Sequence, residues 1–250
     1  MSAVLPVPRV RGQGIVLAHY PVPIAVSKGS LVPLSLLAAV FALFTSGAPT
    51  LLVLGAAALG GLGGAASLIV HELGHVGAAR RLTGVKPVRL SLLWFGAGTR
   101  FEGAYRSGRD QATVAIAGPA ASLALAVLLV ASALLPIPRP LALGLFGLAV
   151  LNGAIAFVSL LPVQPLDGHN LLVGLLWRIA GSEPQAQTSL RRAGKALLGL
   201  ETVGCAALMI EKPLSGSCVL AVVAALYLQK QLWAWPARSA SASSATHRRS

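Results

Sequence analysis

Three side chains that together can hold a metal ion and activate water lie within five consecutive residues. The segment His71-Glu72-Leu73-Gly74-His75 reads His-Glu-x-x-His. Positions i and i+4 of a helix share one face, so His71 and His75 can both present a ring nitrogen to one zinc ion. Glu72 stands beside the first ligand and can take a proton from a water molecule at the metal. The motif therefore indicates zinc-dependent hydrolysis, although a pattern this short also occurs by chance.

The residues before the motif make chance a poor explanation. The 42 residues from Gly29 to Val70 contain no charged side chain. Such a stretch is typical of membrane-spanning helices, and ionisable groups inside a bilayer are costly and usually functional. We therefore expect the histidines and the glutamate to form a site at membrane depth.

A catalytic zinc site needs a third protein ligand and an open position for water. Asp167 is the best candidate, because it follows an uncharged run of 25 residues, 141–165. Two prolines near the end of this run prevent a continuous helix, and broken backbone at membrane depth is expected only beside protein or a cavity. The alternative is that Asp167 caps the next helix. His169 and Glu201 are rival ligands without a supporting motif.

Composition predicts an all-α polytopic membrane protein. Of the 250 residues, 55% are hydrophobic and only 11% are charged, whereas a soluble domain carries roughly a quarter charged residues. Hydropathy predicts about six transmembrane helices: 31–47, 50–79, 112–135, 141–161, 194–210 and 214–233. We expect residues 1–30 to form an N-terminal arm, residues 31–235 an intramembrane domain with its core at 50–180, and residues 236–250 a disordered tail.

The net charge of +13 is attributed to loops on one side of the membrane and not to nucleic-acid binding. With six spans and both termini in the cytoplasm, 18 of the 20 lysines and arginines fall on the cytoplasmic side. The exceptions are Arg139 and Lys212. A multi-pass protein of the cell membrane with cytoplasmic termini is therefore predicted, and the Ala-, Gly- and Arg-rich usage points to a bacterium.

One loop has a pattern of its own. Residues 88–95 and 99–102 flank Gly96-Ala97-Gly98 and partly alternate between apolar and polar side chains. This pattern predicts a short, membrane-associated β-hairpin. The other interpretation is an ordinary amphipathic loop resting at the lipid headgroups.

The motifs and their order resemble the site-2 protease family of intramembrane metalloproteases. The resemblance rests on His71-Glu72-Leu73-Gly74-His75, on Leu166-Asp167-Gly168 and on the intervening Ala117-Gly118-Pro119-Ala120-Ala121-Ser122. It implies one catalytic Zn²⁺ held by His71, His75 and Asp167, with Glu72 as the base. It also implies cleavage of a substrate's transmembrane segment and a membrane-entering hairpin that presents an edge to substrate. No PDZ or CBS domain is expected.

Some positions depart from the family's usual pattern. Ser159 and Ser122 stand where the family usually or often has asparagine, and His169 stands where a second glycine is common. Because those asparagines are associated with substrate, Ser159 and Ser122 are the substrate-binding candidates. Asn152, two turns before Ser159, is a third candidate.

The predicted function is therefore an intramembrane zinc endopeptidase acting on a peptide bond in or near a transmembrane segment. Its expected partners are a transmembrane protein or peptide substrate, the lipid bilayer and a regulatory membrane protein. Two other classes stay open: a catalytically degenerate homologue that binds a membrane partner, and a membrane metal carrier. A carrier needs ligands along a path across the bilayer, and the sequence offers only Glu201 beyond the one cluster.

Overall fold

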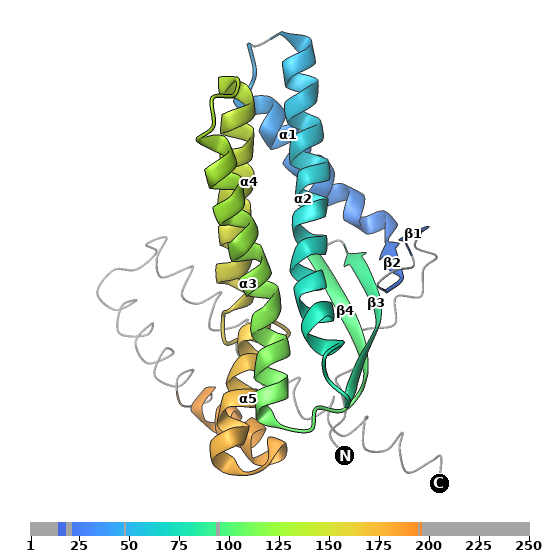
Figure 1. The fold of residues 1–250 in the computed structure, drawn as a ribbon, viewed down its shortest axis with the longest axis vertical. Coiled ribbons are helices and arrows are strands. Elements are labelled where there is room, and N and C mark those ends of the chain that lie inside the picture. Colours follow the sequence, from blue (N-terminus) through green and yellow to red (C-terminus); the bar gives the residue numbers. More distant parts are fainter. Residues whose placement is uncertain (1–14, 19–21, 48, 94–95, 195, 197–250) are drawn as a thin grey trace, which may run out of the picture.

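The computed structural model describes residues 15–18, 22–47, 49–93, 96–194 and 196. These residues form a bundle of long helices with a small sheet at one side (Figure 1). The elements are β1 Ile15–Ala18, β2 Ile24–Val26, the 3₁₀ turn η1 Lys28–Ser30, α1 Leu31–Phe44, α2 Thr50–Ala79, β3 Val85–Leu93, β4 Gly96–Gly103, α3 Gly108–Ala133, α4 Arg139–Ser159 and α5 Asp167–Ala180. Residues 183–194 form a further helical segment.

Three of the described helices are long and apolar enough to cross a membrane: α2, α3 and α4. Their bounds agree with the predicted spans to within four residues, and α2 has the predicted bounds. The helix predicted at 31–47 is shorter than expected, since α1 ends at Phe44. Its 14 residues are also fewer than the ~20 that a bilayer requires. The last two predicted spans lie outside the described residues, apart from residues 194 and 196, as does the tail at 236–250. Among the described residues three helices therefore have membrane length, and the predicted total of six is not confirmed.

The predicted hairpin is present but belongs to a larger sheet. Strands β3 and β4 pair antiparallel, and the sheet order is β1-β2-β3-β4. Strand β2 pairs parallel with β3, with Ile24 opposite Leu90, and β1 pairs antiparallel with β2. The prediction of an all-α fold with one hairpin is therefore incomplete, since the N-terminal arm supplies two further strands. The sequence did not predict these strands, because segments of three and four residues are too short to show alternation.

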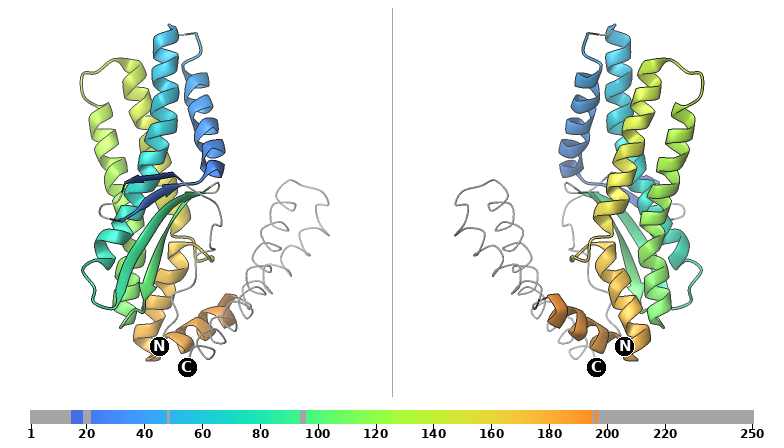
Figure 2. Two further views of the ribbon diagram at one scale, coloured as in Figure 1. Left: turned by 90° about the vertical axis from the view of Figure 1, so that its right-hand side faces the viewer. Right: turned by 90° about the vertical axis from the view of Figure 1, so that its left-hand side faces the viewer.

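Figure 2 shows the sheet lying against one half of α2. Apolar side chains hold it there. A buried cluster joins Ile24 of β2, Leu90 of β3 and Val76 of α2. On β4, Thr99 is buried, whereas the neighbouring Arg100 is exposed, as the two-residue period of a strand requires. The sheet is thus fixed to the helix that carries the His-Glu-x-x-His motif.

The outward faces of the helices are apolar. Leu51, Leu62, Leu128 and Phe157 are all more than 60% exposed. Contiguous exposed apolar surface on long helices matches lipid better than water. The bundle therefore has the surface of a membrane protein.

Candidate metal centre

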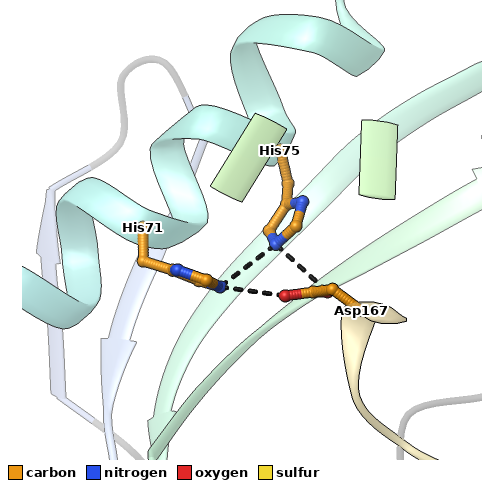
Figure 3. Close-up of side chains that lie close together, drawn as sticks. All are labelled: His71, His75 and Asp167. Atoms are coloured by element: carbon orange, nitrogen blue, oxygen red, sulfur yellow. Dashed lines mark hydrogen bonds and ion pairs between the residues drawn. The ribbon is translucent and has the colours of Figure 1, made fainter. Parts of the chain in front are cut away.

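Two helices that are far apart in sequence bring three ligand atoms together. His71 and His75 lie one turn apart on α2, and Asp167 is the first residue of α5 (Figure 3). The Nε2 atom of His71 lies 3.1 Å from Asp167 Oδ2 and 3.3 Å from His75 Nε2. Asp167 Oδ1 lies 3.3 Å from His75 Nε2. Both rings are buried, while the Asp167 side chain is 20% exposed, so the centre is not sealed from its surroundings.

These distances suit a tetrahedral zinc ion. Zinc bonds of about 2.0–2.2 Å to histidine nitrogen and carboxylate oxygen place neighbouring ligand atoms roughly 3.3–3.6 Å apart, slightly more than the separations found here. The three observed separations are 3.1–3.3 Å. Three protein ligands leave the fourth tetrahedral position open, which is the arrangement of catalytic zinc sites. The donor set therefore fits one zinc ion.

Helix α3 provides a hydrogen-bond partner for the Nδ1 atom of each histidine ring. His75 Nδ1 lies 2.7 Å from the Val114 carbonyl oxygen, which can only accept, so Nδ1 donates and Nε2 keeps its lone pair for a metal. His71 Nδ1 lies 3.0 Å from the hydroxyl of Ser122. Such partners fix the orientation and tautomer of metal-ligating histidines. Val114 and Ser122 are eight residues apart and lie on one face of α3.

Gly118 lies between these two partners and explains the Gly-Pro segment. A Cβ atom at position 118 would collide with the imidazole ring of His75. Gly74 makes the reciprocal close approach, because a Cβ there would collide with the Ala117 carbonyl. Glycine at both positions lets α2 and α3 pack closely enough for the α3 backbone to reach His75.

The catalytic-base candidate has one defined partner. The Thr99 hydroxyl donates to Glu72 Oε2 over 2.7 Å, and both side chains are buried. Thr99 belongs to β4, so the sheet contacts the motif directly. The sequence did not single out Thr99, because its meeting with Glu72 depends on how the sheet packs on α2. The alternation around residue 99 is the only local signal that it faces inward.

Comparisons with known proteins agree with this geometry. The model of Peptidase family M50 matches residues 61–137, which include His71, Glu72 and His75. A Synechocystis protein named "Putative zinc metalloprotease sll0528" is 35% identical over 133 residues, 52% of this chain and 34% of that protein. A Mycobacterium tuberculosis protein named "Putative zinc metalloprotease Rip3" is 36% identical over 145 residues, 55% of this chain and 37% of that protein. The chain thus spans about a third of the length of these curated relatives.

The fold has a solved counterpart. The site-2 protease from Methanocaldococcus jannaschii superposes with a TM-score of 0.51 at 18% identity, covering 88% of this chain and 94% of that one. The M50 match and the shared fold agree. The chain is similar to Peptidase family M50 over residues 61–137 and shares its fold with a site-2 protease. The match to the family model ends at residue 137, before Asp167, so the third ligand position rests on the structure.

The three substrate-binding candidates, Asn152, Ser159 and Ser122, have partners within the bundle. Asn152 is fully buried and donates to Ser67 Oγ over 2.8 Å and to the Leu148 carbonyl over 2.9 Å. Ser159 donates to the Ala156 carbonyl over 3.1 Å. Ser122 is fully buried against His71 and orients a ligand.

Of the two rival ligands, His169 lies among the described residues and Glu201 does not. His169 is buried, and its Nε2 lies 3.3 Å from Gln164 Nε2. It is not one of the three residues whose ligand atoms converge. Glu201 lies outside the described residues.

Tyr105, in the connection between β4 and α3, lies near the metal ligands. Burial, together with the negative charges of Asp167 and Glu183, raises the pKa of Tyr105 to about 12. The phenol is therefore neutral at any physiological pH and adds no charge beside the site. Like Thr99, it had no motif to mark it in the sequence.

Proposed function

We propose that this protein is an intramembrane zinc endopeptidase that hydrolyses a peptide bond in or near a transmembrane segment of a membrane-anchored substrate. The observation that carries the proposal is the convergence of three possible metal ligands. His71 and His75, with Glu72 beside them, lie on a helix long enough to span a bilayer, and Asp167 meets them from the start of α5. Similarity to Peptidase family M50 and to two proteins named as putative zinc metalloproteases supports the same reaction class. A metal carrier is less well supported, since one group of three possible ligands is found among the described residues.

The chemistry divides between metal and protein. Bound zinc would supply Lewis acidity, which makes a water molecule more acidic and polarises the scissile carbonyl. Glu72 takes the proton of the attacking water and returns it to the leaving amine. His71, His75 and Asp167 hold the ion, while Val114 and Ser122 keep the rings aimed at it. Every group this scheme requires is buried or half-buried around one point.

Strand β4 is the proposed place for the substrate. A transmembrane helix hides its amides in internal hydrogen bonds, so a substrate must unwind before it can be cut. Among the described strands, β4 has one neighbour, β3, which leaves its other edge available for an extended segment. Thr99 of β4 touches Glu72, so a segment added to this edge would lie near the catalytic base.

The proposed orientation puts the α1–α2 and α3–α4 connections outside the cytoplasm. Figure 1 shows both connections at one end of the bundle and α5 at the other. Basic residues are numerous at the α5 end, and Arg139 lies at the opposite end. The protein would then be a multi-pass protein of a bacterial cell membrane. Cytoplasmic termini, a transmembrane protein or peptide substrate and a regulatory membrane partner belong to this proposal.

The decisive experiment replaces the base and keeps the ligands. Purified protein in detergent micelles is incubated with a panel of synthetic transmembrane-segment peptides, and products are identified by mass spectrometry. Wild-type protein should cleave at least one peptide, and Glu72→Gln should lose the activity by at least ~100-fold, because general base catalysis contributes 10²–10⁴-fold. The zinc content, measured by elemental analysis, should stay near one ion per chain.

The control is Asp110→Asn, which neutralises a carboxylate in the first turn of α3 that lies neither on β4 nor among the converging ligands. It should cleave at the wild-type rate. Cleavage by Glu72→Gln at the wild-type rate would contradict the proposed role of Glu72 and the hydrolytic mechanism with it.

A further inference from the structure

The contact between Thr99 and Glu72 joins the sheet to the catalytic base. The hydroxyl-to-carboxylate distance is 2.7 Å, and the two residues are 7% and 6% exposed. A hydrogen bond to a carboxylate in such a buried place is stronger than one in water and constrains the side chain that accepts it. Glu72 therefore has one of its two oxygens fixed by a residue outside its own helix.

Thr99 is itself held firmly. Its register partner on β3 is Leu90, which is fully buried and packs with Val76 of α2. Val76 lies one helical turn after Glu72. Hence the backbone that carries Thr99 is anchored by apolar packing to the helix that carries Glu72. Because threonine is β-branched and stiff at χ1, its hydroxyl has little freedom to turn away.

We propose that Thr99 is a positioning residue for the catalytic base. Its hydroxyl occupies one oxygen of Glu72 and leaves the second to accept the proton of the attacking water. The inference deepens the proposed function and depends on it. It also assigns β4 two tasks, since the strand proposed to receive the substrate also carries the group that orients the base.

The test separates the hydroxyl from the packing around it. Thr99→Val keeps the branched shape and removes the donor, whereas Thr99→Ser keeps the donor. On the peptide that wild-type protein cleaves, Thr99→Val should lower kcat about 10- to 100-fold, because a misplaced catalytic group can cost that much. KM and zinc content should stay within about twofold of wild type, since neither the β4 edge nor a zinc ligand has changed. Thr99→Ser should recover most of the lost kcat.

Thr188→Val is the matched control, because Thr188 is an exposed threonine that donates to the Pro184 carbonyl away from the metal centre. It should cleave like wild type. Wild-type kcat in Thr99→Val, an equal loss in Thr99→Ser, or a parallel loss of zinc would each overturn the positioning role. If wild-type protein cleaves no faster than Glu72→Gln, the proposed function fails and this inference fails with it. If only the Thr99 variants behave unexpectedly, the proposed function stands and the inference alone is lost.

Discussion

At the scale of single residues, the metal centre is defined as much by hydrogen bonds as by ligands. The Val114 carbonyl selects the tautomer of His75, and the Ser122 hydroxyl supports His71. Such partners change metal affinity 10- to 100-fold in other zinc proteins. The carboxylate of Asp167 brings the only negative charge among the three ligands. It should therefore contribute more to holding a divalent cation than either partner of the rings.

Replacing Asp167 should release the metal. Asp167→Ala removes one of three ligands, so the purified variant should retain well under half of the wild-type zinc content, as measured by elemental analysis after dialysis. Asp110→Ala is the control, because Asp110 is an aspartate in the first turn of α3 and is not among the converging ligands. Unchanged zinc stoichiometry in Asp167→Ala would shift the third ligand to another residue.

At the residue scale, the relative position of two side chains can be predicted from sequence where spacing alone decides it. His71 and His75 meet because four residues make about one helical turn. The meeting of Asp167 with that pair depends on a tertiary contact, yet the proline break in an uncharged run was enough to suggest it. Thr99 and Tyr105 had no such signal. A threonine on a short strand looks the same in sequence whether it faces lipid, water or a buried glutamate.

At the scale of elements, α3 is the structural support of the centre. Val114, Gly118 and Ser122 lie at four-residue intervals, so one face of this helix carries both ring partners and the glycine that permits contact. A helix whose contacts are this close tolerates no added volume at the point of crossing.

A methyl group at position 118 should disturb the metal centre. Gly118→Ala places a Cβ into the His75 ring, so the ring must move away from Val114 and from the other ligands. We expect zinc affinity to fall at least about 10-fold, by competition with a chelator, and the thermal midpoint of the zinc-free protein to fall. Gly153→Ala is the control, since a Cβ there meets no other atom, and alanine should even favour the helix by up to ~1 kcal/mol. Equal zinc affinity in both variants would contradict this account of Gly118.

Long elements were predictable from sequence, and short ones were not. The bounds of α2, α3 and α4 follow from apolar runs of membrane length, which nothing else in a sequence imitates. Strands β1 and β2 were missed because their stability comes from pairing with each other and, for β2, with β3, and not from their own pattern. Helix α1 was predicted three residues too long because its continuation, Thr45-Ser46-Gly47, is no more than a turn.

At the scale of the whole molecule, the apolar surface and the distribution of charge point to a fixed orientation in the bilayer. Exposed leucines cover the helices, and Arg139 is set apart from the basic residues near the sheet and α5. In the proposed orientation, which follows the positive-inside rule, the sheet and α5 face the cytoplasm.

Cysteine labelling tests this orientation. With Cys205 and Cys218 replaced by serine, Pro136→Cys in the α3–α4 connection should react with a membrane-impermeant maleimide in intact bacterial cells. Arg106→Cys, before α3, should react only after the cells are permeabilised. Both positions are exposed, so reactivity reports the side of the membrane. Labelling of Arg106→Cys alone in intact cells would invert the orientation.

The parallel pairing of β2 with β3 limits how α1 can move. Strand β2 precedes α1 and strand β3 follows α2. Their pairing therefore connects the start of α1 to the end of α2, and η1 also contacts β3. A substrate that enters the bundle sideways past α1 must either break the short β2–β3 pairing or leave the N-terminal end of α1 in place. In the second case α1 can only pivot about its N-terminal end at the sheet, so that its C-terminal end, at the α1–α2 turn, moves away from the bundle.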